Sequence, residues 1–259
     1  MPPVRPPARK PARRIPALTG PLLVAGLFGC STASGPGAGT PPAAETTTSV
    51  VGHADGGNLD AAYADLRGAG GRVFKIDPAA SAVRIYAFRA GKASRLGHNH
   101  VLSAPKFVGY FHLPATGTSS ARFDLEFRLD DLEIDDPALR AAAGPAFATA
   151  TSPSSIEATR EHMLGADGLQ AARYPFVRIH SLQIVGEAPR FAAHVRVEMH
   201  GRVRDLWLPL RAEGLPDSLA VEGSLVLRQT DFDAQPYQVL GGMLAVEDEV
   251  VVEFRLVGA

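Results

Sequence analysis

The chain contains a single cysteine, Cys30, among its 259 residues. No disulfide can form within the chain, and no thiol nucleophile is present in the residues that follow Cys30. The sequence also lacks a Gly-x-Ser-x-Gly elbow, a His-Glu-x-x-His pair and a phosphate-binding glycine loop. We therefore interpret the chain as a protein that is not an enzyme.

Positive charge is scarce beyond the N-terminus. The first 29 residues hold five basic side chains and no acidic one, whereas the rest of the chain holds 21 basic and 27 acidic side chains, a net charge of −6. A surface of that sign repels phosphate backbones, so we exclude nucleic acid as a partner. The hydrophobic fraction of 46% is enough to bury a core.

The basic N-terminus leads into an apolar run over residues 15–29. This run is too short to span a bilayer as a stable helix and suits the middle of a secretory signal. It ends at Leu27-Phe28-Gly29-Cys30, which resembles a bacterial lipobox, whose cysteine is lipidated and becomes the new N-terminus. We predict a lipoprotein signal peptide over residues 1–29 and lipidation of Cys30. An ordinary cleaved signal with an incidental cysteine is the alternative.

Residues 30–71 are rich in Gly, Pro, Ala and Thr and offer little to bury. They predict a flexible linker between a lipidated N-terminus and a folded domain over residues 72–259. Within the linker, residues 58–63 could form one or two helical turns that Asn58 caps and Gly68 ends.

After residue 71 the sequence alternates between apolar and polar side chains. In RFDLEFRLD (residues 122–130), Phe123, Leu125 and Phe127 fall on one face, as in a half-buried strand. Similar signals lie at residues 73–76, 83–88, 107–113, 177–184, 193–199, 206–210, 219–227 and 250–256. This pattern of about eight or nine strands predicts an all-β fold, an antiparallel sheet closed into a barrel, because parallel strands are usually apolar on both faces.

One segment interrupts this pattern. Ser154 and Glu157 have the spacing of a capping box, and they predict a short helix from about Ser155 to Leu164. Residues 135–150 are rich in Ala and Pro and read as irregular or weakly helical. The adjacent acids Asp135 and Asp136 are expected to face water.

His98 and His100 stand in RLGHNH, residues 95–100. In an extended chain their Cα atoms would lie roughly 6–7 Å apart on one face, close enough for two imidazoles to meet one metal. Zinc needs at least three protein ligands, and the other histidines are scattered. A structural role, a ligand contact at the barrel mouth and a metal site remain open. Trp207, the only tryptophan, is a barrel-wall residue or a ligand contact.

Several segments together resemble the YceI-like family, whose members are polyisoprenoid-binding, lipocalin-like barrels of the bacterial envelope. The similar segments are residues 74–83, 162–164 with 172–179, 199–206, 229–233 and 240–250, in the family's order within residues 72–257. Two positions depart from the pattern, since Asp233 stands where the family often has Gly and RLGHNH has a second histidine.

The resemblance implies an eight-stranded antiparallel barrel, elongated like a lipocalin, whose apolar interior binds a long isoprenoid-type chain. Ligand-binding candidates are His98, His100, Phe123, Leu125, Phe127 and Trp207; no metal or cofactor is assigned. We expect an envelope lipoprotein in the periplasm, held on a membrane by Cys30, with the outer membrane favoured because Ser31 is not acidic. A homodimer stays open. The rival hypotheses are a redox partner that binds metal or cofactor through His98 and His100, and a filled barrel that acts as an interaction module.

Overall fold

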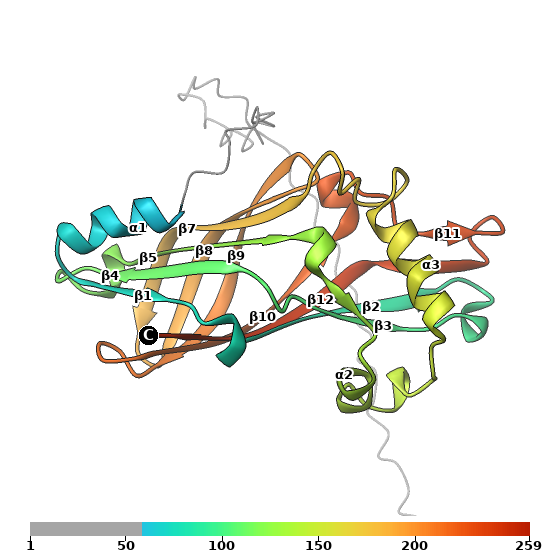
Figure 1. Cartoon of the computed structure of the whole chain (residues 1–259), viewed down its shortest axis with the longest axis horizontal. Helices are drawn as coiled ribbons and strands as arrows, with labels where there is room; N and C mark the ends of the chain where they lie inside the picture. The colour runs from blue at the N-terminus through green and yellow to red at the C-terminus, as the bar shows by residue number, and fades with distance from the viewer. Residues whose placement is uncertain (1–58) are drawn as a thin grey trace, which may run out of the picture. The chain divides into compact units, whose positions relative to one another are not determined.

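The computed structural model describes residues 59–259 (Figure 1). The predicted signal peptide, the lipidated Cys30 and the linker up to residue 58 lie outside these residues. None of the helices between residues 59 and 259 is both long enough and apolar enough to cross a membrane.

Antiparallel strands form a single curled sheet, as the alternation predicts (Figure 1). The strands are β1 (Arg72–Lys75), β2 (Ala82–Ala90), β3 (His100–Ser103), β4 (Val108–Leu113), β5 (Arg122–Arg128), β6 (Glu133–Ile134), β7 (Phe176–Glu187), β8 (Arg190–Met199), β9 (Arg202–Glu213), β10 (Leu219–Arg228), β11 (Gln238–Val239) and β12 (Leu244–Gly258). Their order across the sheet is β1-β4-β5-β7-β8-β9-β10-β12-β2-β3-β6, and β11 pairs with β12.

The predicted count of eight strands is corrected to twelve. Three of the eight passes of chain are broken into two strands each: β1 with β2, β3 with β4, and β5 with β6. In the first pass Asp77 caps a 3-10 turn at Pro78–Ala80 by accepting a hydrogen bond from the Ala79 N–H. Pro78 has no N–H to donate to a ladder, so the strand stops there. The short strands β3, β6 and β11 carry no alternation long enough to be seen in the sequence.

The sheet closes on itself at one end. Ile76, just after β1, forms a bridge with Gly258 at the end of β12, and the backbones of Lys75 and Ala259 exchange hydrogen bonds of 3.0 and 3.1 Å. A Cβ atom at Gly258 would lie 3.0 Å from the Cβ of Phe74, so a larger residue there would require the neighbouring side chains to shift. At the other edge of the sheet, β6 pairs only with β3, so strand pairing does not close the sheet there in the described chain.

Helices lie outside the sheet and across its open end (Figure 1). Helix α1 (Leu59–Gly68) packs on β1 and β4 and buries Tyr63 completely, so residues 59–68 of the predicted linker form a helix against the sheet. Helix α2 (Pro137–Ala142) follows β6 and begins at Asp136, whose carboxylate accepts from two backbone N–H groups.

Helix α3 (Pro153–Leu164) confirms the predicted helix but not its cap. The Oγ atom of Ser152, rather than that of Ser154, accepts the Ser155 N–H at 3.1 Å. The helix starts two residues earlier than predicted because Pro153 suits the first helical position, where no N–H is needed. Helix α2 precedes α3 in the same excursion and lies within residues 135–150, which the sequence predicts to be irregular or weakly helical.

Candidate functional site

The inward face of the barrel surrounds a cavity of about 920 Å³. Phe123, Leu125 and Phe127 line it, so all three inward candidates on β5 lie where the alternation predicts. The other walls present further apolar side chains, among them Leu102, Val195, Leu210, Leu225, Val252 and Phe254. Because these side chains come from every part of the curled sheet, the cavity exists only in the folded barrel.

The volume of this cavity bears on the rival hypothesis of a filled barrel. Ligand pockets commonly measure about 300–1,000 Å³ and are mostly apolar, with a few polar groups that fix orientation. A cavity of about 920 Å³ lies in that range, and its walls are built from aliphatic and aromatic residues. The structure therefore argues against a barrel packed solid with its own side chains.

The cavity opens at one end of the barrel. Its lining residues that are exposed to solvent all come from two segments, α3 with the turn after it and the stretch between β10 and β11. These exposed lining residues are Ala158, His162, Asp167, Arg228, Gln235, Tyr237 and Gln238. We call the opening between the two segments the entrance.

Helix α3 lies over the entrance and makes few buried contacts with the rest of the barrel. None of its residues is fully buried. The ring of His162 packs against that of Tyr237 across the entrance, with ring centroids 4.7 Å apart. On the other side of α3, the guanidinium of Arg160 donates to the backbone carbonyls of Asp130 and Leu132. The helix thus bridges the two sides of the opening through polar and aromatic contacts, and its partly buried Ile156, Met163 and Leu164 pack against the core.

His100 lines the cavity wall and is tied to a buried carboxylate. Its Nδ1 lies 2.7 Å from Oδ2 of Asp135, while Oδ1 of Asp135 accepts from the Arg140 guanidinium at 2.6 Å and from the Val101 N–H at 3.0 Å. Burial raises the pKa of Asp135, but the hydrogen bonds from His100, Val101 and Arg140 outweigh it and hold the pKa below its usual range. An ionised Asp135 keeps a proton on Nδ1 of His100 and leaves Nε2 for other partners.

The sequence reasoning did not find this network. Asp135 and Asp136 were expected to face water together, whereas Asp135 is buried and only Asp136 caps a helix at the surface. The signal was the Pro137 that follows, because Asp before Pro is typical of a helix start and splits the roles of the two acids.

His98 does not join His100. It does not line the cavity, and its Nδ1 is buried without a hydrogen-bond partner in the described part of the chain. Between residues 59 and 259 no three His, Cys, Asp or Glu side chains are grouped as metal ligands would be. The two histidines therefore have separate environments, and the hypothesis of a shared prosthetic group gains no support from the geometry.

Trp207 lies on the outer face of the barrel. Its side chain is 52% exposed and stacks on the ring of His194, with centroids 4.8 Å apart and planes at 10°. Leu208 and Leu210 on the same strand point inward and line the cavity. Because successive side chains on a strand alternate, Trp207 points away from the ligand space. This placement removes Trp207 from the candidate contacts.

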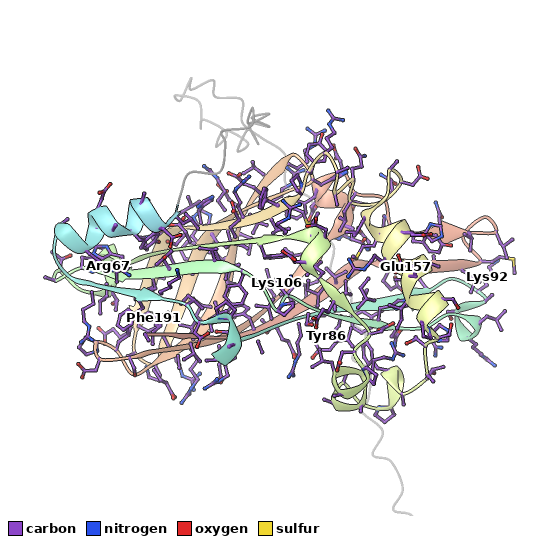
Figure 2. All side chains as sticks on the ribbon, in the orientation of Figure 1. Arg67, Tyr86, Lys92, Lys106, Glu157 and Phe191 are labelled. Atoms are coloured by element: carbon purple, nitrogen blue, oxygen red, sulfur yellow. The ribbon has the colours of Figure 1, made fainter. Side chains whose placement is uncertain are left out.

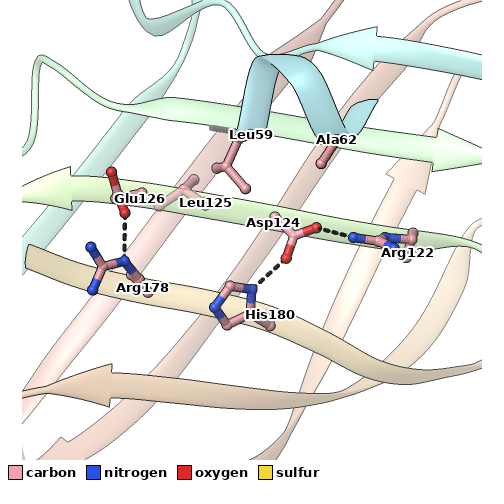
Figure 3. A pocket seen from close by; sticks show the side chains of 8 residues that line it. All are labelled: Leu59, Ala62, Arg122, Asp124, Leu125, Glu126, Arg178 and His180. Carbon is pink, nitrogen blue, oxygen red and sulfur yellow. Dashed lines mark hydrogen bonds and ion pairs between the residues drawn. The ribbon is translucent and has the colours of Figure 1, made fainter. Parts of the chain in front are cut away.

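A second pocket of about 370 Å³ lies outside the barrel, beneath α1 (Figure 3). Its floor is charged: Asp124 on β5 accepts from the Arg122 guanidinium at 3.1 Å and from the Tyr63 hydroxyl at 2.5 Å, and it also pairs with Nδ1 of His180. Beside them Arg178 donates to Glu126 at 2.5 Å. Since these charges already satisfy one another, we favour the larger apolar cavity as the functional site.

The charged floor shifts two pKa values. The hydrogen bond to Asp124 raises the pKa of His180 and prevails over burial, which lowers it. Burial raises the pKa of Asp124, but its hydrogen bonds from His180, Tyr63 and Arg122 lower it further than burial raises it. Both shifts favour an ion pair between a protonated imidazole and a carboxylate at neutral pH.

Comparisons with known proteins agree with this geometry. A family model described as the YceI-like domain matches residues 74–258. The crystal structure of Burkholderia cenocepacia BcnA is similar to this chain, with a TM-score of 0.53 and 14% sequence identity, over 71% of this chain and 99% of that one. The YCEI protein of Campylobacter jejuni, crystallised with large solvent channels, gives 0.43 and 8% over 61% and 84%. At these identities the likeness to BcnA shows the fold alone. No curated protein matches the sequence.

Proposed function

Because this chain belongs to the YceI-like domain family, we propose that it binds or carries an apolar, polyisoprenoid or lipid-like molecule inside its barrel and catalyses no reaction. The observation that carries the proposal is the cavity of about 920 Å³ with apolar walls and one entrance. Expelling water from such walls favours binding by roughly 25 cal/mol for each Å² of apolar surface covered. Selectivity then depends on the length and shape of the cavity.

His100 supplies a polar group in the wall of the cavity. Its Nδ1 is committed to Asp135, so a carbonyl or hydroxyl of the ligand would meet Nε2. The network with Arg140 fixes the ring, so the contact would be made without first ordering the side chain.

The proposal also covers location. The basic start, the apolar run over residues 15–29 and the lipobox-like Leu27-Phe28-Gly29-Cys30 support a lipoprotein exported to the cell envelope and held on a membrane, with the outer membrane favoured. A lipid-anchored carrier would remain close to the membrane that supplies its cargo. Metabolic labelling of Cys30 with a lipid precursor tests the proposed lipid anchor separately.

Native mass spectrometry of the purified protein, followed by solvent extraction, tests the binding proposal. We expect a discrete extra mass that extracts as an apolar chain, and the same measurement counts the protomers. A protein that is empty and also fails to take up added polyprenyl quinones would contradict the proposal.

A pair of neighbouring substitutions on β10 makes the test specific to the cavity. Leu225 lines the cavity, whereas Val226 is 59% exposed on the outer face. Leu225→Trp should fill part of the cavity and lower ligand occupancy at least several-fold. Val226→Trp adds the same side chain outside and should leave occupancy unchanged. Equal effects of the two substitutions would show that the ligand binds elsewhere.

A further inference from the structure

Two loops meet at the open end of the barrel. One joins β2 to β3 and contains a 3-10 turn at Ser94–Leu96; the other joins β11 to β12. The Ala93 N–H donates to the carbonyl of Met243 at 2.8 Å, so the loops are held against each other. Figure 2 shows Lys92 at this extremity, beyond β11. We call Leu96, Leu240 and Met243, which these loops carry, the apolar tip.

The apolar tip is exposed to an unusual degree. Leu96 is 77% exposed and Leu240 73%, the two highest values among the exposed large apolar side chains, and Met243 is 48% exposed. A single exposed leucine needs no explanation, but exposed apolar residues gathered in two touching loops mark a contact surface. Nothing in the described chain covers these side chains.

The two loops that carry the apolar tip hold basic and no acidic side chains. The loop between β2 and β3 carries Lys92 and Arg95, and Arg89 precedes it; neither residues 89–99 nor residues 237–246 include an acidic side chain. Lys92 and Arg95 are exposed and form no ion pair with a described residue. Several other exposed basic residues are paired with acids, for example Arg128 with Asp130 and Arg196 with Asp205, whereas neither loop segment offers Lys92 or Arg95 an acidic side chain. The basic character is therefore local, on a chain that is acidic beyond its N-terminus.

The apolar tip adjoins the entrance of the cavity. Tyr237, Gln238 and Val239 line the cavity, and Leu240 follows them directly in the chain. A surface that covers the apolar tip would thus also lie beside the opening under α3.

We propose that the apolar tip inserts into a lipid surface with anionic headgroups. Exposed Leu and Met side chains enter the boundary between headgroups and acyl chains, and neighbouring Lys and Arg side chains are attracted to anionic lipids. Insertion directs the entrance toward the bilayer, so an apolar chain can pass into the cavity with little exposure to water. The transfer of an apolar chain into the cavity rests on the proposed function, whereas the insertion of the apolar tip into the lipid surface does not. The contact is separate from the predicted anchor at Cys30.

Site-specific fluorescence tests the insertion in the full chain. Cys30→Ser removes the only native thiol, and Leu240→Cys or Asp217→Cys then accepts an environment-sensitive label. Asp217 serves as the matched control because it lies in the β9–β10 turn, at the opposite end of β12 in the strand register. The vesicles contain phosphatidylcholine and phosphatidylglycerol, with nitroxide-bearing acyl chains as quenchers.

We expect the label at residue 240 to brighten several-fold on the vesicles and to be quenched by the nitroxide lipids, while the label at residue 217 stays in water. Binding through the N-terminal segment alone would leave both labels in water and would overturn the proposal. A change at residue 240 that follows protein concentration without lipid would assign the tip to a second copy of the chain and overturn it too. Native mass spectrometry of the same proteins reports ligand binding independently, so the two proposals can fail separately.

The basic residues give a second measurement. Lys92→Gln with Arg95→Gln should weaken binding to the anionic vesicles by about tenfold or more, since each basic side chain near such a surface contributes about fivefold. Arg190→Gln with Arg211→Gln removes the same charge from β8 and β9, away from the two loops, and should have a much smaller effect. Equal losses for the two double variants would show that net charge alone drives the association and would contradict docking at the tip.

Discussion

Helices α1 and α3 are similar in length but are held to the barrel in opposite ways. Helix α1 buries Tyr63 completely, stacks it on Tyr110 at 4.8 Å and ties its hydroxyl to Asp124. Helix α3 buries no residue fully and meets the far side of the entrance through the rings of His162 and Tyr237. Helix α1 is therefore anchored to the barrel by a buried side chain, whereas helix α3, over the entrance, has no fully buried side chain.

This difference shows where the fold concentrates its stability. Segments with few buried contacts open at lower free energy than the core, and ligand-binding loops come from that group. The contacts of Tyr63 with Tyr110 and Asp124 stabilise the wall beneath α1. The barrel therefore keeps its shape while the entrance region exchanges ligand. Three predictions test this contrast.

The largest effect should follow the loss of the buried tyrosine. Tyr63→Ala removes a fully buried ring and leaves Asp124 with one partner fewer, and it should lower the free energy of unfolding by about 3–5 kcal/mol in urea denaturation. Met163→Ala on α3 should cost about 1 kcal/mol because Met163 is only partly buried. Tyr63→Phe, which keeps the ring, should fall between them. Similar losses from Tyr63→Ala and Met163→Ala would remove the contrast between the helices.

A smaller effect should depend on pH. Because the pKa of His180 is raised in the folded protein, its ion pair with Asp124 adds stability that is fully present below the unfolded pKa of about 6.5 and is lost as pH rises through the higher folded value. His180→Gln should therefore cost about 1 kcal/mol near pH 6 and less at higher pH. Urea denaturation of both proteins across this range measures the difference, and a cost that grows with pH would reverse the assigned sign.

The smallest effect on stability should accompany a clear effect on ligand exchange. Tyr237→Ala removes the ring that meets His162 across the entrance and should change the free energy of unfolding by no more than about 0.5 kcal/mol. Release of a fluorescent polyprenyl probe in stopped flow should become roughly 2–10 times faster, as expected for an aromatic contact of about 0.5–1.5 kcal/mol. Trp207→Ala, which removes an outer aromatic stack, is the control and should leave release unchanged. Unchanged release in Tyr237→Ala would show that the contact does not restrict the entrance.

Much of the barrel could be predicted because alternation is local. Phe123, Leu125 and Phe127 line the cavity as their spacing indicates, and the same rule, applied to Leu206, Leu208 and Leu210, would have placed Trp207 outside. The strand breaks were harder to predict, since a two-residue strand such as Glu133–Ile134 has no period to detect.

The sites that escaped prediction depend on partners far apart in the chain. Asp135 is buried, and its carboxylate is satisfied by hydrogen bonds with His100, 35 residues away, and with Arg140. Asp124 looked like one polar residue of an exposed strand face, and only the packing of α1 makes it buried. Pro137 marks Asp136 as a helix cap, but no neighbouring residue identifies the partners that bury Asp135 and Asp124.

The sequence by itself determined the fold class, the inward faces, the helix after residue 152 and the family, because periodicity, capping and short motifs act over a few residues. The tertiary structure alone decided that the barrel is hollow, that His100 lines the cavity while His98 does not, and that the entrance adjoins the apolar tip with its neighbouring basic side chains. Those features arise where strands and loops distant in the chain meet, and the space or charge they create belongs to no single segment.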